Sequence, residues 1–402
     1  MKINTGQGQI SLVVLLAIWS VSAVVSLPGL AVSPILGDLH KIFPGVSDLE
    51  TQMLTSLPSL LIIPFVLLSG KLSVGRSTIP ILMTGLAIFF LCGIGCFFAR
   101  SMRALIWISC LLGVGAGMVI PISTGLVADY FTGSYRVRQL GYSSAINNLT
   151  LVLATMLTGY LAEKDWHLPF LVYTLPGVVL ILSFYIRRYP PKVMSVRPPK
   201  GQKESLSQID WKRLTALMGF YFFITFVVLA IVFYLPFLTQ AYRLDSSFSG
   251  LLISLFFLAI TLPGVLLNRI IRLWRANVNL VSLFCLGVGL LLIALFRNDG
   301  LLILGCIVTG LGYGVMQPII YEKTTVTAPP QLATFVLSCV MSVNYLAIMI
   351  CPFMIDLLRK LFHTTSDLFP FWFNAAAALV VAVYAWRRRG SFVLGMDTSY
   401  YE

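Results

Sequence analysis

Two stretches of sequence decide the fold: Gly113-Val-Gly-Ala-Gly-Met-Val-Ile-Pro121 and Gly310-Leu-Gly-Tyr-Gly-Val-Met-Gln-Pro318. Their three glycines and their final proline match, and each matched pair lies 197 positions apart. The same offset carries Asn147 onto Asn344. A nearly constant offset between separated stretches indicates an internal repeat of a structural unit. The sequence therefore predicts two related halves.

The composition predicts a membrane protein. Of the 402 residues, 58% are hydrophobic and 11% are charged, with a mean hydropathy of +0.91. Soluble domains carry about 25% charged residues. A hydropathy window of about 19 residues predicts an all-α membrane protein with twelve transmembrane helices in two six-helix bundles related by a pseudo-twofold axis. The predicted spans are 10–33, 52–72, 79–99, 103–129, 140–162, 167–187, 213–239, 248–271, 278–296, 301–325, 332–357 and 368–387.

The basic residues predict the orientation. With the amino terminus inside, 20 of the 28 Lys and Arg residues fall on the cytoplasmic side and eight outside. The positive-inside rule then places both termini in the cytoplasm, and we expect a bacterial inner (plasma) membrane. The predicted organisation is an N-terminal bundle over 1–187, a basic Pro-rich linker over 188–212, and a C-terminal bundle over 213–402 that ends in a short cytoplasmic tail.

Several functional classes are excluded by the pattern. The net charge of +13 lies in short clusters between apolar runs, so no nucleic-acid partner is expected. The seven cysteines lie in apolar runs and the three histidines are scattered, so neither a metal site nor a cofactor is expected. No catalytic constellation is visible, so the chain is not expected to be an enzyme. The spaced glycines lack the Gly-Lys-Ser/Thr ending of a phosphate loop, and we expect them to let helices approach closely.

These features resemble the major facilitator superfamily over nearly the whole chain. The loop between the second and third spans, Gly70-Lys-Leu-Ser-Val-Gly-Arg76, keeps the Gly-x-Leu start and the Gly-Arg end of the family motif but lacks its acidic residue. Ser109 stands where the fourth-span motif of many members carries an arginine associated with proton coupling. The resemblance implies alternating-access transport, and the missing arginine argues against the usual proton antiport.

The resemblance also implies a substrate cavity between the halves, near mid-membrane. Polar and aromatic residues at that depth are the candidates. The repeat-related amides Asn147 and Asn344 have two open interpretations, contact with a ligand or hydrogen bonds between helices. The full set of cavity candidates is Trp19, Ser22, Thr55, Tyr142, Asn147, Asn148, Tyr221, Phe222, Thr225, Tyr313, Gln317, Asn344 and Tyr345.

Three acidic residues fall within predicted spans, where ionisable groups are costly and often functional. The resemblance implies that Asp129 pairs with Arg76 and latches a cytoplasmic gate; the alternative is an acid that reaches the interface. Glu322 is a candidate for proton exchange, if partly desolvated; the alternative is an ion pair with Arg269 or Arg272. Asp356 is the third candidate for coupling or gating.

The predicted cavity is apolar, aromatic and amide-bearing, which suits a small amphipathic or weakly polar solute. The leading hypothesis is a secondary active transporter similar to the drug-efflux branch, with protons as a second partner and a monomer as the working unit. The alternative is uptake of a small metabolite or an anion, for which no arginine is expected inside the cavity. From another class, a non-transporting membrane receptor or enzyme is the third hypothesis.

Overall fold

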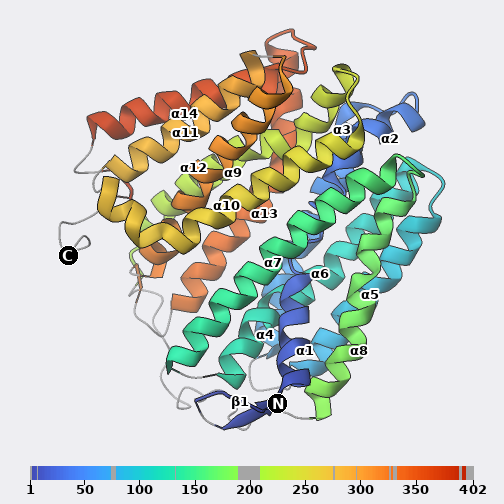
Figure 1. Ribbon diagram of the computed structural model, residues 1–402, viewed down its shortest axis with the longest axis vertical. Helices are drawn as coiled ribbons and strands as arrows, with labels where there is room; N and C mark the ends of the chain where they lie inside the picture. The colour runs from blue at the N-terminus through green and yellow to red at the C-terminus, as the bar shows by residue number, and fades with distance from the viewer. Residues whose placement is uncertain are drawn as a thin grey trace. The chain divides into compact units, whose positions relative to one another are not determined.

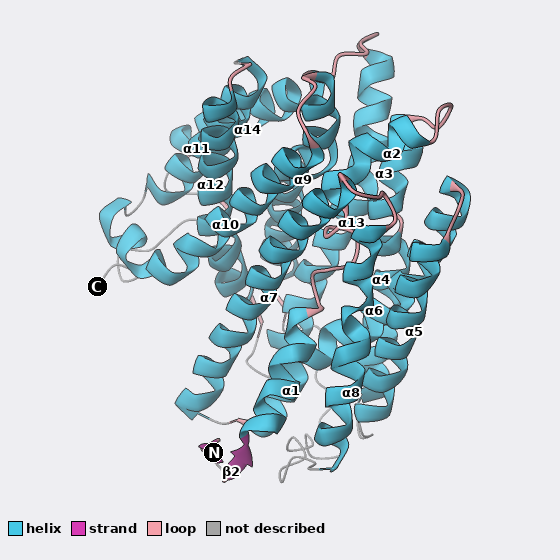
Figure 2. Cartoon of the chain, turned by 45° about the vertical axis from the view of Figure 1, so that its right-hand side comes forward, coloured by secondary structure: helices cyan, strands magenta, loops and turns pink. Residues whose placement is uncertain are grey.

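The computed structural model describes residues 2–6, 8–73, 78–131, 133–188, 209–274, 277–295, 297–325, 327–328, 333–388 and 392–394. The chain forms two compact units, 1–202 and 203–402. The described part is almost entirely helical, apart from a small hairpin at the amino terminus (Figure 2). The predicted linker 188–212 lies mostly outside the described residues, so its limits stay a prediction.

The first unit begins with an antiparallel hairpin in which Lys2 pairs with Ser11. Its helices follow in chain order (Figure 1). Its elements are β1 (Lys2–Asn4), β2 (Gln9–Ser11), α1 (Leu12–Ala23), η1 (Ser33–Ile35), α2 (Leu36–Ile42), α3 (Asp48–Ser56), α4 (Pro58–Ser73), α5 (Ile79–Phe98), α6 (Met102–Tyr130), α7 (Gly133–Ala162), η2 (Leu168–Thr174) and α8 (Leu175–Arg188).

The second unit consists of six long helices in its described residues. Its first helix starts at an Asp210 N-cap, whose carboxylate accepts a hydrogen bond from the Arg213 backbone N–H at 3.0 Å. The elements are α9 (Trp211–Ala241), α10 (Ser246–Trp274), α11 (Val278–Leu295), α12 (Asp299–Thr325), α13 (Ala333–Leu361) and α14 (Phe369–Arg387).

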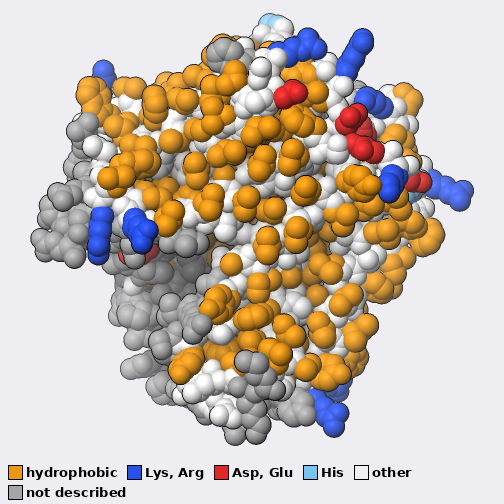
Figure 3. All heavy atoms as spheres, in the orientation of Figure 1, with side chains coloured by type: hydrophobic (Ala, Val, Ile, Leu, Met, Phe, Trp, Pro, Cys, Tyr) orange, Lys and Arg blue, Asp and Glu red, His pale blue; other side chains and the backbone are white. Residues whose placement is uncertain are grey.

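Eleven stretches of the described chain are long and apolar enough to cross a membrane. They correspond to the second to twelfth predicted spans. Side chains that face outward from these helices are apolar, as at Trp107, which is 73% exposed, and Val380, which is 68% exposed. On the face drawn in Figure 3, hydrophobic side chains cover most of the described surface and charged side chains gather near its edges.

The first predicted span differs most from the structure, whereas the second is divided into α3 and α4 and the sixth into η2 and α8. The sequence predicts one helix over 10–33, whereas α1 ends at Ala23 and turns follow as far as the short helix η1. Gly29, which follows Pro28, adopts a φ of +76°, a left-handed conformation that does not belong to a regular helix. A Cβ added there would clash with the Thr55 carbonyl oxygen, so only a glycine fits this position.

The repeated glycines position α6 and α12 within their own units. A Cβ added at Gly115 would lie 2.6 Å from the Gly85 carbonyl oxygen of α5, and one at Gly312 would lie 2.7 Å from the Ser282 carbonyl oxygen of α11. The glycines on either side of them face α4 in the first unit and α10 in the second. Gly113 abuts the Pro58 carbonyl of α4. The expected close approach of helices is confirmed, because only a glycine fits these contacts.

The two units share one packing pattern. In the first, α6 packs on α4 and α5, α5 packs on α8, and α1 contacts α6, α7 and α8. In the second, α12 packs on α10 and α11, α11 packs on α14, and α9 contacts α12, α13 and α14. The main helix contacts of the second unit therefore repeat those of the first. The predicted duplication of a six-helix bundle is confirmed within each unit.

Candidate functional site

A cluster of hydroxyl and amide groups lies between α9 and α12. Tyr221 of α9 is at its centre. Its Oη atom lies 2.7 Å from the Oη atom of Tyr321 and receives hydrogen bonds from the Gln317 amide nitrogen at 3.2 Å and from the Tyr313 hydroxyl at 3.5 Å. Thr225 Oγ1 extends the cluster to Tyr313 Oη at 3.3 Å. We call these five residues the tyrosine cluster.

The tyrosine cluster brings together four of the predicted cavity residues: Tyr221, Thr225, Tyr313 and Gln317. It contains no ionisable acid or base besides the phenols. Tyr221, Thr225 and Tyr313 are buried, whereas Gln317 is half-buried. Five hydrogen bonds join the hydroxyl and amide groups to one another, as expected for polar groups inside a helical bundle.

Tyr321 was missed by the sequence analysis. It is half-buried and also receives a hydrogen bond from the Gln317 amide nitrogen at 3.2 Å. A signal was available, because Tyr313, Gln317 and Tyr321 follow one another at intervals of four residues and so share one face of a helix. The sequence analysis chose the neighbouring Glu322 as a coupling candidate instead.

The remaining candidates of the second unit do not join the cluster through hydrogen bonds. Phe222 stacks on Phe226 with ring centroids 6.1 Å apart. Asn344 and Tyr345 of α13 are half-buried, and neither side chain makes a hydrogen bond to a residue that the structure describes. Their contact with a ligand stays a prediction.

A second set of candidates meets between α1 and α7 in the first unit. The Trp19 indole N–H donates a hydrogen bond of 2.9 Å to the Gln139 side-chain oxygen, and the Trp19 ring meets the Tyr142 ring edge-on at 5.9 Å. Gln139 is buried and was not among the predicted residues. Polar and aromatic side chains therefore line both sides of the α1–α7 contact.

Asn147 holds the bend that follows α1. Its amide nitrogen donates a hydrogen bond to the Ser26 hydroxyl at 2.8 Å, and its oxygen accepts one from the Ser26 backbone N–H at 3.1 Å. The structure thus supports the interhelical interpretation at Asn147, whereas Asn344 makes no such bond to the described residues. The repeat-related amides differ because the counterpart of the bent first span, α9, is one continuous helix.

Three further candidates have different surroundings. Thr55 is fully buried, and its hydroxyl donates a hydrogen bond to the Gln52 carbonyl oxygen at 3.0 Å, so its side chain is part of the packed core of the unit. Ser22 is also buried. Asn148 is half-buried and makes no side-chain hydrogen bond to a described residue.

The coupling candidates lie near the helix ends. Asp129 is half-buried near the end of α6; its predicted partner Arg76 lies outside the described residues, so the latch stays a prediction. Glu322 and Arg269 are exposed at the surface of their unit, and the coupling role of Glu322 is likewise a prediction. Asp356 pairs with Lys360 at 2.8 Å on α13.

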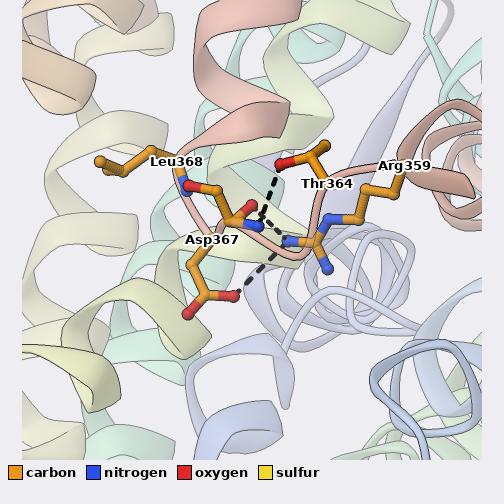
Figure 4. A network of polar contacts seen from close by, with 5 residues as sticks. Arg359, Thr364, Asp367 and Leu368 are labelled. Carbon is orange, nitrogen blue, oxygen red and sulfur yellow. Dashed lines mark hydrogen bonds and ion pairs between the residues drawn. The ribbon is translucent and has the colours of Figure 1, made fainter. Parts of the chain in front are cut away.

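Arg359, in the last turn of α13, is largely buried. The Arg359 side chain is 13% exposed and pairs with Asp367 at 3.5 Å. It also donates a hydrogen bond to the Ser366 carbonyl oxygen at 3.3 Å and lies over the Tyr234 ring at 5.3 Å from the centroid. Figure 4 shows the guanidinium group turned toward Asp367 within the α13–α14 loop. Its charge is therefore already balanced by a carboxylate.

The described residues contain no group of three or more His, Cys, Asp or Glu side chains that could hold a metal ion. All seven cysteines are free, and each is buried or half-buried. Ser109, where the resemblance expects an arginine, is buried with its Oγ atom 3.8 Å from Cys96 Sγ. The chemistry of the site is thus that of uncharged hydroxyl, amide and aromatic groups.

Comparison with known proteins decides the family. Residues 12–352 match the family model described as Major Facilitator Superfamily. The chain belongs to the major facilitator superfamily. The sequence resemblance is therefore confirmed, and the twelve-span, two-bundle fold class is that of the superfamily.

Two curated relatives are similar over part of the chain. The Quinolone resistance protein NorA of Staphylococcus aureus is 32% identical over 121 residues, which cover 30% of this chain and 29% of that protein. The Multidrug transporter protein MdtP of Bacillus subtilis is 29% identical over 159 residues, which cover 38% of this chain and 28% of that protein. The matched regions thus span less than a third of each relative.

Solved structures of superfamily members share the fold over nearly the whole chain. A D-xylose-proton symporter superposes with a TM-score of 0.75 at 13% identity and covers 96% of this chain and 99% of its own. A point mutant of the nucleoside transporter NupG has a TM-score of 0.73 at 11% identity, over 94% and 98% of the two chains. At these identities the likeness concerns the fold alone.

Proposed function

We propose that this superfamily member is a secondary transporter that exports small amphipathic or weakly polar compounds by alternating access. The tyrosine cluster is the observation that carries the substrate class. It combines aromatic rings with uncharged hydrogen-bonding groups, a combination that suits ligands with a large apolar part and few polar atoms. The partial similarity to a quinolone resistance protein and a multidrug transporter supports export.

Both termini are placed in the cytoplasm in this proposal, in accord with the excess of Lys and Arg in the loops on that side. A proton gradient is the proposed energy source. Glu322 and Asp129, which lie near helix ends, are the proposed sites of proton exchange. Ser109 occupies the fourth-span position where many members carry an arginine, so the usual arginine cannot take this part. Arg76 would be the partner of Asp129 in a gate.

The alternative of anion uptake has less support. An anion needs a cationic side chain that is free to bind it, and the largely buried Arg359 is paired with Asp367. A small uncharged metabolite remains as an alternative substrate of an uptake protein. The direction of movement separates the two functions.

Accumulation of the uncharged dye Nile red in bacterial cells tests the proposal. Cells that produce the protein should retain less dye than cells with an empty vector, and a protonophore should remove the difference. Higher internal dye on expression would indicate uptake. Equal retention for Nile red and for a panel of lipophilic drugs would contradict export.

A further inference from the structure

The tyrosine cluster has one more hydrogen-bond donor hydrogen than it has hydrogen bonds. The Gln317 amide supplies two hydrogens, and the hydroxyls of Tyr221, Thr225, Tyr313 and Tyr321 supply one each, which makes six. The cluster contains five hydrogen bonds. None of these residues has a further partner in the described part of the chain. One hydrogen is therefore left without an acceptor.

The orientation of the Gln317 amide follows from the same count. If its oxygen faced Tyr221 and Tyr321, only the four hydroxyl hydrogens would be available for five contacts, and one contact would join two acceptors. With the nitrogen facing the tyrosines every contact has a hydrogen. The Gln317 carbonyl oxygen then points away from the cluster, and it accepts no hydrogen bond from the described residues.

The unused hydrogen belongs to Tyr321. Tyr221 Oη already accepts hydrogen bonds from Gln317 and from Tyr313, which occupy its two acceptor positions. Tyr221 must therefore donate its own hydrogen to Tyr321 Oη across the 2.7 Å contact. Tyr321 keeps an O–H group with no partner among the described residues. Tyr221 is fully buried, whereas Tyr321 and Gln317 are half-buried, so the two unused groups lie on the accessible residues.

We infer that Tyr321 and Gln317 recognise an uncharged ligand group that carries a hydrogen-bond acceptor next to a donor, as in a primary amide, a lactam or a urea. The Tyr321 hydroxyl donates to the ligand oxygen, and the Gln317 carbonyl accepts from the ligand N–H. An ionised carboxylate is disfavoured because it would face the Gln317 oxygen without a hydrogen. This inference rests on the proposed export function and adds the polar group that selects the substrate.

Three uncharged fluorescent probes test the inference: 7-methoxycoumarin-3-carboxamide, its N,N-dimethylamide and 3-ethyl-7-methoxycoumarin. The first has donor and acceptor on its substituent, the second only the acceptor, and the third neither. Everted membrane vesicles containing the full chain should take up the carboxamide fastest. The ratio of its rate to that of the ethyl compound is independent of protein amount, because both rates are measured on the same vesicles.

Tyr321→Phe should lower the carboxamide and dimethylamide rates about tenfold relative to the ethyl compound, since each loses one hydrogen bond. Gln317→Met should lower only the carboxamide rate by a similar factor. Tyr185→Phe, which changes an exposed tyrosine of α8, is the matched control and should keep the wild-type ratios.

The outcomes separate the two claims. Unchanged ratios in Tyr321→Phe, or a wild-type protein that moves all three probes at equal rates, would overturn the inference and leave export standing. If either variant does not fold, the wild-type preference among the probes decides. Uptake of none of the three above the level of control vesicles would overturn the export function and the inference together.

Discussion

The repeat-related asparagines show that the same residue type can have different hydrogen-bond partners at equivalent positions. Asn147 uses both ends of its amide to hold Ser26, and Asn344 has no such partner among the described residues. Asn147→Ala should therefore lower the unfolding free energy by about 1 kcal/mol, whereas Asn344→Ala should leave it nearly unchanged. Thermal unfolding of the purified variants in detergent measures the difference. Equal losses would contradict the assignment.

Asp165, in the loop between α7 and η2, links stability to pH. The backbone N–H of His167 and then its ring, both 2.8 Å from the carboxylate, lower the pKa of Asp165 below its ordinary value. A depressed folded pKa contributes stability above the unfolded value of about 3.9 and loses it as the pH falls through the folded value.

Asp165→Asn keeps an oxygen acceptor and removes the charge. The wild type should melt at a higher temperature than this variant at pH 6, and the gap should shrink as the pH falls below about 4. Melting temperatures of both proteins along the same pH series measure the gap. A gap that does not change with pH would show that the carboxylate charge has no part in stability.

At the scale of the helix, alanine substitutions at different glycines should change the stability in opposite directions. Gly115→Ala and Gly312→Ala would each place a methyl group less than 3 Å from a neighbouring backbone. Overpacking of this kind costs about 1–3 kcal/mol. Gly125→Ala meets nothing within 4 Å and should stabilise the helix by up to about 1 kcal/mol.

Expression level and melting temperature of the three alanine variants give the comparison. The repeat requires that Gly115→Ala and Gly312→Ala behave alike, because Gly115 faces α5 and Gly312 faces α11, the counterpart of α5 in the second unit. A benign effect at one of the two sites would show that the units are packed differently there.

The chain segment after α14 packs back on the second unit. Phe392 meets the Phe220 ring of α9 edge-on at 5.2 Å, and the Leu394 carbonyl oxygen accepts a hydrogen bond from the Asn279 amide of α11 at 3.2 Å. Phe392→Ala should cost about 3 kcal/mol, as for a buried aromatic residue. Val393→Ala, at a half-buried neighbour, is the matched control. Similar melting temperatures for both variants would contradict this contact.

The sequence alone predicted the helices well where composition and repeat agreed. The glycine contacts were predictable because small residues at fixed spacing have few other uses inside an apolar helix. The break after Ala23 was missed because a hydropathy window averages over residues 24–32 and gives no weight to the turn signal Pro28-Gly29 within them. The hydrogen bond from Asn147 to Ser26 depends on that break and was hidden with it.

For the candidate site, the choice of polar and aromatic residues near mid-membrane predicted four members of the tyrosine cluster. They could not show which polar side chains satisfy one another, because an apolar helix has no hydrophobic periodicity to mark its inner face. Thr55 illustrates the limit: a polar residue at mid-depth is as well suited to a packed core as to a ligand. Only the three-dimensional structure separates these cases, and it shows that Tyr321 also belongs to the tyrosine cluster.

At the scale of the whole molecule, the protein is a superfamily member with two equivalent bundles and, among its described residues, an uncharged polar cluster in the second. In the proposed function, an ion gradient supplies the energy for export. The central claim is therefore that the purified chain alone moves an uncharged amphipathic compound against its gradient.

Transport into proteoliposomes tests this claim most directly. Purified protein is reconstituted, a pH gradient with an acidic lumen is imposed, and the internal concentration of 7-methoxycoumarin-3-carboxamide is followed. We predict accumulation above the level of protein-free liposomes, with collapse on addition of a protonophore. Internal and external concentrations that stay equal, with or without the gradient, would contradict the account.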